Sequence, residues 1–209
     1  MKKVVITGMG IVCPVGSGLQ YAWANLLQGK SGIRKITEFD TDDLASKIAG
    51  LPIRGTEPGD FNPDAVIEPK EQRKMDKSII YGLTAAHEAL QDAGLLEYDG
   101  DKNRVGVSVG SGVGGLSTIA DTYKDILESG TTRFVSPFFV PKSVVNMTAG
   151  YIADLWRHNF KLSDLFYSVT VCPACASPGS LILGWLSLPS LLILPPSLTL
   201  PHIFVPFRL

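Results

Sequence analysis

The sequence predicts a layered α/β fold, because short apolar runs lead into glycines and then into amphipathic helical segments. The first run, residues 4–7, is β-branched and ends at a glycine. The second, residues 105–109, continues directly into the glycine loop GSGVGG at 110–115. Between the two runs, residues 76–93 carry an apolar stripe at helical spacing. This alternation of strand, glycine loop and helix is typical of α/β domains.

The helix predicted at 76–93 has the clearest boundary signals in the chain. Asp76 can cap its N-terminus, and Gly94 can end it. The other predicted elements are a helix at 21–27 ended by Gly29, a helix from the glycine loop to Leu127, and an irregular surface excursion at 34–68.

Composition and charge argue against several classes of partner. The chain has 209 residues and a formal net charge of −1, which does not indicate a nucleic-acid or anionic-membrane partner. Three cysteines are an odd number without disulfide-framework spacing, which favours a reducing compartment and a cytoplasmic location. The basic and apolar start is broken by glycines and lacks a cleavage pattern, so it predicts a strand and not a signal peptide.

The composition changes after about residue 152. From residue 165 onward the only charged residue is Arg208, and this segment holds half of the 14 prolines. Its longest proline-free apolar stretch, 181–188, is shorter than the roughly 20 residues a membrane helix needs. We therefore expect a truncated N-terminal domain at 1–152. An aberrant apolar tail at 153–209, translated out of frame or otherwise foreign, would follow it, with no membrane insertion.

The glycine loop at 110–115 formally matches the dinucleotide-binding pattern G-x-G-x-x-G. The acidic residue that should follow about twenty positions later is missing, since residue 135 is valine. Close backbone packing at a strand-to-helix turn is therefore favoured over nucleotide binding.

A basic cluster, KEQRK at 70–74, precedes the long predicted helix. Taken alone, it fits a solvated surface patch better than a dock for an acidic partner, although both remain open.

Cys172 and Cys175 form a C-x-x-C pair. A metal site would need a second pair or histidines at ligand spacing, so neither a metal nor another cofactor is expected. The pair could instead be a dithiol of an oxidoreductase. Alternatively, one cysteine could be a nucleophile, because the small residues at 174–177 would admit a bulky acyl substrate. The favoured alternative is that these cysteines arise from a shifted reading frame.

Four segments together resemble the β-ketoacyl-[acyl-carrier-protein] synthases, close to the synthase II branch. They are MKKVVITGMGIVCPVGSG at 1–18, KEQRKMD at 70–76, GVSVGSGVGGL at 106–116 and SPFFVPKSVVNMTAG at 136–150. The resemblance implies a thiolase-like layered α-β-α-β-α fold, incomplete here because only the N-terminal half is covered, and usually assembled as a homodimer. It also implies elongation of a fatty acid by decarboxylative condensation of an acyl thioester with malonyl-carrier protein.

The resemblance also implies roles for individual residues. The surface that binds acyl carrier protein would consist of Lys70, Arg73, Lys74 and Arg133. The substrate pocket would include Val113, Phe139 and, as the weaker candidate, Phe138, although core packing remains an alternative for the two aromatic residues.

The nucleophile segment departs from the family pattern. The expected Y-G and G-P are absent, and the family's spacing from Asn146 leads to Val169, which is not a cysteine. Cys175, within A-C-A-S, is the candidate nucleophile, and Cys172 is a weaker one. The family's two catalytic histidines lie far beyond that cysteine, whereas this chain ends 34 residues after it. The chain alone is therefore expected to be inactive. Its alternative role would be to bind acyl carrier protein or a synthase subunit.

Overall fold

A computed structural model describes residues 5–97, 106–155, 167–170 and 203–204 of the chain. Within these ranges the α-helices are α1 (Leu19–Leu27), α2 (Pro69–Gln72), α3 (Lys77–Asp92), α4 (Leu116–Ser129), α5 (Phe139–Ser143) and α6 (Met147–Leu155). A 3-10 helix, η1, spans Pro63–Ala65. The strands are β1 (Val12–Cys13), β2 (Gly16–Ser17), β3 (Ile33–Lys35), β4 (Ile48–Gly50), β5 (Val107–Gly110), β6 (Tyr167–Thr170) and β7 (Ile203–Phe204).

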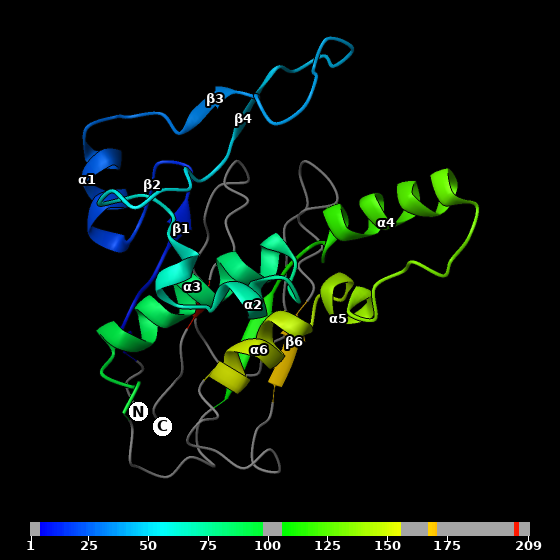
Figure 1. The fold of residues 1–209 in the computed structure, drawn as a ribbon. Coiled ribbons are helices and arrows are strands. Elements are labelled where there is room, and N and C mark those ends of the chain that lie inside the picture. Colours follow the sequence, from blue (N-terminus) through cyan, green and yellow to red (C-terminus); the bar gives the residue numbers. More distant parts are fainter. Residues whose placement is uncertain (1–4, 98–105, 156–166, 171–202, 205–209) are drawn as a thin grey trace.

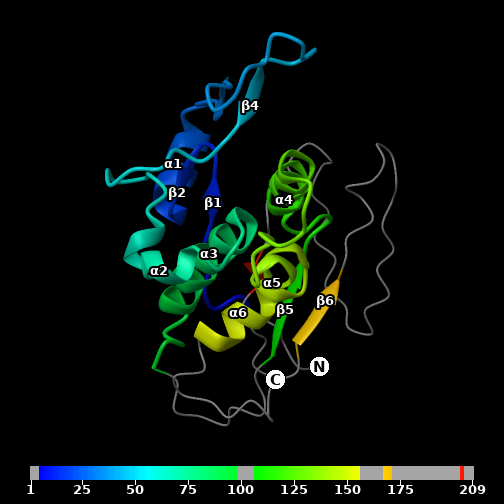
Figure 2. The same cartoon turned by 45° about the vertical axis from the view of Figure 1, so that its right-hand side comes forward.

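Helix α3 lies at the centre of the described structure (Figure 1). Its apolar face carries Ile79, Leu83 and Ala86, which are almost completely buried. These side chains form one cluster with Val109 of β5 and Ile152 of α6. Helices α3 and α6 therefore pack against the same part of the sheet, and Figure 2 shows both to the left of β5. Burial of this face is the main stabilising contribution to the fold.

The sheet around β5 has the strand order β6-β5-β7. Strand β6 runs parallel to β5, with Val109 opposite Val169 and Gly110 opposite Thr170. Strand β7 pairs with the other edge of β5 in the antiparallel direction. Both hydrogen-bonding edges of β5 are therefore occupied.

The predicted strand at residues 4–7 is wrong for the residues that the structure describes. Residues 5–7 have no strand conformation, and the side chains of Val5 and Ile6 are 65% and 67% exposed. The edges of β5, the buried strand, already pair with β6 and β7, so this apolar run has no edge of β5 to join.

The excursion predicted at 34–68 is largely exposed, as expected, but it is not wholly irregular. Strands β3 and β4 form an antiparallel pair in which Arg34 lies opposite Ala49. This pair extends away from the helices, at the top of Figure 1. Nearer the body, Phe61 is buried and packs edge-on against Tyr81 of α3, with 4.9 Å between the ring centroids.

The predicted helices are confirmed with small shifts at their ends. Helix α3 has Asp76 as its N-cap, and Gly94 follows it with a φ of 65°. Helix α1 begins two residues before the predicted start and ends at the predicted residue, Leu27. Helix α4 extends to Ser129, two residues beyond the prediction.

Candidate functional site

The candidate site lies where two parallel strands end. Strand β5 ends at Gly110 and leads into the glycine loop, and β6 ends at Thr170 beside it. Because carboxyl ends of parallel strands meet at the same sheet edge, the chain leaves β6 next to this loop. Cys175 follows Thr170 by five residues. Cys175 and Cys172 themselves lie outside the described residues.

The same register bears on the position that family spacing selected for the nucleophile. Val169 lies inside β6, opposite Val109, and not in a turn after the strand. A nucleophile at a strand-to-helix elbow must follow its strand. Cys175, which comes after the end of β6, meets that requirement in sequence, whereas position 169 does not.

The glycine loop packs tightly against α5. A Cβ atom at Gly114 would collide with the carbonyl oxygen of Ser143, and one at Gly115 would collide with that of Lys142. The N–H of Gly115 also donates to the Ser143 carbonyl at 3.2 Å. The loop therefore needs glycine at these two positions for close backbone packing. Gly115 is the last glycine of the G-x-G-x-x-G pattern, so its contact supports the packing interpretation at that position.

Asp76 connects the two helices that flank this loop. Its carboxylate accepts hydrogen bonds from the Ser78 N–H at 2.9 Å and the Ser78 hydroxyl at 2.8 Å, at the start of α3. It also accepts a hydrogen bond from the Thr118 hydroxyl in the first turn of α4, at 2.7 Å. Burial would raise the pKa of Asp76, but hydrogen bonds from Ser78 and Thr118 outweigh burial and lower it. Asp76 is therefore a charged acceptor shared by two helix N-termini.

The predicted carrier-protein surface centres on the short helix α2. Lys70 and Arg73 are exposed, and neither forms an ion pair with another described residue. Lys74 differs from them, because its side chain is 33% exposed and its ammonium group bonds to Glu71 at 2.6 Å. Lys70 and Arg73 are thus available to a partner, whereas Lys74 is already paired with Glu71.

Lys74 also links α2 to α5. Its Nζ atom lies 5.9 Å from the ring centroid of Phe138, the residue that caps α5. Tyr151 of α6 belongs to the same neighbourhood. Burial raises the pKa of Tyr151, with Glu71 acting in the same direction and Lys74 opposing it. One predicted docking residue and one predicted pocket residue are therefore in contact.

The other predicted site residues are not gathered into one cavity. Val113 is 58% exposed in the glycine loop, and Phe139 is half-buried at the start of α5. Arg133 is exposed in the loop between α4 and α5. A hollow beside α4 is lined by residues such as Ile126 and Phe134, and by none of the predicted pocket residues.

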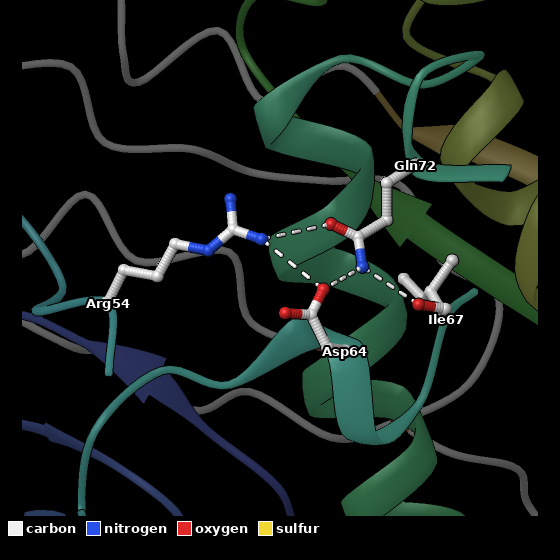
Figure 3. A network of polar contacts seen from close by, with 4 residues as sticks. All are labelled: Arg54, Asp64, Ile67 and Gln72. Carbon is white, nitrogen blue, oxygen red and sulfur yellow. Dashed lines mark hydrogen bonds and ion pairs between the residues drawn. The ribbon is translucent and has the colours of Figure 1, made fainter. Parts of the chain in front are cut away.

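A polar network beside α2 was not predicted from the sequence. Gln72 is buried and bonds to Asp64 and to the backbone of Ile67, and Arg54 contacts both Gln72 and Asp64 (Figure 3). The available signal was an amide placed between charged residues in KEQRK. No local pattern pairs it with residues 8 and 18 positions earlier.

Comparisons with known proteins identify the class. A family model described as the N-terminal domain of β-ketoacyl synthase matches residues 1–182. The chain therefore belongs to the β-ketoacyl synthase family. The match extends 30 residues beyond position 152 and includes Cys172 and Cys175.

The curated relatives are more specific. The chain is 46% identical over 163 residues to 3-oxoacyl-[acyl-carrier-protein] synthase 2 of Rhizobium meliloti (strain 1021). The aligned residues cover 77% of this chain and 38% of that relative. The chain is 42% identical over 152 residues to the protein of the same name from Vibrio cholerae, covering 73% of this chain and 35% of that relative. These matches confirm the resemblance to the N-terminal part of a β-ketoacyl-[acyl-carrier-protein] synthase II. The chain spans less than two-fifths of either relative.

Solved structures confirm the fold class. The ishigamide ketosynthase/chain length factor matches with a TM-score of 0.67 and 27% identity, covering 80% of this chain and 39% of that one. A β-ketoacyl synthase from Burkholderia phymatum STM815 matches with a TM-score of 0.60 and 26% identity, covering 81% and 38%. The fold is the thiolase-like fold of the ketosynthases, of which this chain holds an N-terminal part.

Proposed function

We propose that this chain is the N-terminal part of an enzyme that elongates fatty acids by decarboxylative condensation of an acyl thioester with malonyl-acyl carrier protein. Its described residues supply the carrier-protein dock and the scaffold of the acyl site. The curated relatives carry the corresponding name, 3-oxoacyl-[acyl-carrier-protein] synthase 2. The observation that carries the proposal is the parallel pairing of β6 with β5, which sets Thr170, the last described residue before Cys172 and Cys175 in the sequence, opposite Gly110 at the start of the glycine loop.

The first chemical step assigned to this segment is acyl transfer to Cys175. The Cys175 thiolate attacks the thioester carbonyl of acyl-carrier protein and forms a new carbon–sulfur bond. The old carbon–sulfur bond breaks, and the carrier thiol leaves with a proton from solvent. This transfer exchanges one thioester for another and needs no oxidant or metal.

Acyl transfer can be tested on the intact 209-residue chain. The chain is incubated with acyl-acyl carrier protein and examined by mass spectrometry for the added acyl mass. The proposal expects an adduct that maps to Cys175 and is lost in Cys175→Ser but kept in Cys172→Ser. Loss of the adduct in Cys172→Ser alone, or an adduct on neither cysteine, would contradict the assignment of Cys175. Disulfide reductase activity lost in Cys172→Ser would instead favour the dithiol alternative.

A second candidate function is binding without turnover, and the free cations on α2 favour it. Lys70 and Arg73 are exposed and available to carboxylates of an acidic partner. Reversing both charges, by Lys70→Glu and Arg73→Glu, is expected to weaken acyl carrier protein binding at least tenfold at low salt. Isothermal titration calorimetry measures the change. Lys30→Glu with Lys35→Glu, at exposed positions outside α2, is the matched control, because it makes the same change of net charge elsewhere.

We also propose a homodimer, as is usual in the family, with α4 in its interface. Helix α4 buries none of its residues, and its apolar side chains at Leu116, Tyr123 and Leu127 are each more than 60% exposed. Light scattering coupled to size-exclusion chromatography should give twice the mass of one chain. The variant Leu116→Glu should instead give the mass of a single chain. A monomeric native chain would refute this assembly.

We place the protein in the cytoplasm. The free thiol of Cys13 supports this, because unpaired cysteines are typical of reducing compartments. Separately, no helix among the described residues is long and apolar enough to cross a membrane. Cell fractionation followed by immunoblotting tests the location, and recovery outside the cytoplasmic fraction would contradict it.

We further propose the domain division inferred from composition, with a truncated domain at 1–152 and a divergent tail at 153–209. The loss of charge after residue 165 supports it. The nucleotide sequence around codon 153, read in all three frames, tests it. Recovery of the missing Y-G and G-P in another frame would support the divergent tail and would overturn the assignment of Cys175 as the nucleophile, because Cys175 lies within 153–209. Their absence from all three frames would contradict the division at residue 152.

A further inference from the structure

Helix α2 is held to the body of the protein by an amide and not by apolar packing. It has one turn, Pro69–Gln72, which is too short to be stable by itself. Gln72 is its only buried residue. The exposed cations Lys70 and Arg73 lie two positions before Gln72 and one position after it. The orientation of both cations therefore depends on how Gln72 is held.

The Gln72 side chain is held by three partners from two other segments. Its Nε2 atom donates to Asp64 Oδ1 at 2.7 Å and to the Ile67 carbonyl oxygen at 2.8 Å. Its Oε1 atom accepts a hydrogen bond from the Arg54 guanidinium at 3.3 Å.

Arg54 closes the network. The same guanidinium nitrogen also donates to Asp64 Oδ1 at 3.3 Å, so each of Arg54, Asp64 and Gln72 contacts the other two (Figure 3). Asp64 belongs to η1, and the backbone of Arg54 forms an isolated bridge with Phe61. The network thus ties α2 to two segments that precede it in the chain.

The contacts of this network differ in their energetic weight. The side chains of Arg54 and Asp64 are 63% and 54% exposed, so their ion pair is screened by water and weak. Gln72 is buried, and a buried amide left without partners is costly. Ile67 joins the main apolar cluster, so its bond to Gln72 anchors α2 directly to the core.

We propose that Gln72, held by Asp64 and Arg54, is a positioning residue that sets the orientation of Lys70 and Arg73 for an acidic carrier protein. Hydrogen bonds are directional, so an amide with partners at both ends fixes the rotation of a one-turn helix. An apolar side chain of similar size would fill the space without fixing that rotation. This inference rests on the proposed docking function of α2. The benefit of fixed orientation is that less ordering is required when the partner binds.

The central test is Gln72→Met in the full chain, which removes the hydrogen bonds while keeping similar volume and the same net charge. We expect the dissociation constant for acyl carrier protein to rise about tenfold, with a shallower dependence on salt because fewer cations engage at once. Isothermal titration calorimetry at several salt concentrations measures both quantities. Circular dichroism establishes the folded fraction of each sample.

A purely structural role predicts a different result. It would lower the melting temperature of Gln72→Met but leave the dissociation constant of the folded molecules unchanged. Leu90→Ala, a buried substitution near the C-terminal end of α3, serves as the destabilised control that should bind normally. Arg54→Met provides a variant at an exposed site, where folding is not at risk. It should weaken binding about twofold, because it removes only the outer contacts.

A rescue experiment tests the network directly. Gln72→Glu replaces the donor by a carboxylate that faces Asp64, and it should weaken binding at least as much as Gln72→Met. Adding Asp64→Asn returns an N–H donor between the two side chains and restores the native net charge. In this double variant, the increase in the logarithm of the dissociation constant should be at most half of the increase seen in Gln72→Glu alone.

Two results would overturn the inference, and they can be told apart. If Lys70→Glu with Arg73→Glu weakens binding but Gln72→Met does not, the docking surface stands and the positioning role is wrong. If the charge reversal itself leaves binding unchanged, the docking function fails and the positioning role fails with it.

Discussion

Replacing Asp76 by alanine should destabilise the protein in a way that involves both α3 and α4. The substitution removes the N-cap of α3, which costs about 1 kcal/mol. It also removes the charged acceptor of the Thr118 hydroxyl, a bond worth about 1.5–3 kcal/mol. We therefore expect the free energy of unfolding to fall by about 3 kcal/mol.

A double-mutant cycle separates the two contributions. Thr118→Val alone should cost about 1.5 kcal/mol, because Asp76 keeps its bonds to Ser78. In a chain that already carries Asp76→Ala, the same substitution should cost almost nothing. The coupling energy should therefore be about 1.5 kcal/mol. Urea unfolding followed by circular dichroism at pH 7 measures all four proteins.

The pH dependence has a definite sign. The folded protein lowers the pKa of Asp76, despite burial, through hydrogen bonds from Ser78 and Thr118. The corresponding stabilisation is present above the pKa of the unfolded chain and is lost as pH falls through the folded value. The difference between the native protein and Asp76→Ala should therefore shrink below about pH 4. Additive effects of the two substitutions, or a difference that grows in acid, would refute this account.

Two further predictions concern contacts made by backbone groups. Gly115→Ala should cost at least about 2 kcal/mol, because its Cβ would meet the carbonyl oxygen of Lys142, whereas Gly150→Ala, with open space around it in α6, should be neutral or stabilising. Equal melting temperatures for these two variants would contradict the packing described for the glycine loop. Glu88→Gln should cost about 1–2 kcal/mol, since the Glu88 carboxylate accepts hydrogen bonds from the Leu19 N–H at 2.6 Å and the Ile11 N–H at 2.9 Å. Thermal unfolding monitored by circular dichroism measures the loss, and an unchanged midpoint would contradict this prediction for Glu88→Gln.

Helix α3 could be predicted from the sequence because its signals are local. Asp76 and Gly94 mark its ends, and its apolar residues recur at helical spacing, so no distant segment is needed to recognise it. The tertiary contacts of α3, in contrast, involve residues that are distant in the sequence. The side chain of Glu88, in α3, accepts a hydrogen bond from the N–H of Leu19 at the start of α1, 69 residues earlier.

The failed strand at residues 4–7 illustrates the opposite case. An apolar β-branched run becomes a strand only where a sheet edge is available. The edges of β5 are taken by residues 167–170 and 203–204, which lie far away in the sequence. Helix α6 was missed for a related reason. Its segment contains glycine, and its place in the core depends on contacts of Ala149 and Ile152 with α3 and β5.

The candidate site was predictable in its residue types but not in their partners. The resemblance selected Lys70, Arg73 and Lys74 as equivalent cations, since sequence alone gives them the same chemistry. The structure distinguishes them, because Lys74 is bonded to Glu71 and lies over the ring of Phe138. Such a difference arises from tertiary contacts that no spacing rule contains.

These contacts have a consequence for how docking and acyl binding are related. Residues 70–76 carry both the exposed cations and Asp76, the acceptor shared by α3 and α4. Lys74, within the same segment, contacts Phe138 at the start of α5. The other end of α5 packs against Gly115 of the glycine loop. A change in the position of α2 would therefore affect both α4 and α5, which contact the glycine loop, through direct contacts. For this reason the cations are better tested by substituting exposed Lys70 and Arg73 than by substituting Lys74, whose loss would alter the surface and the packing of α5 together.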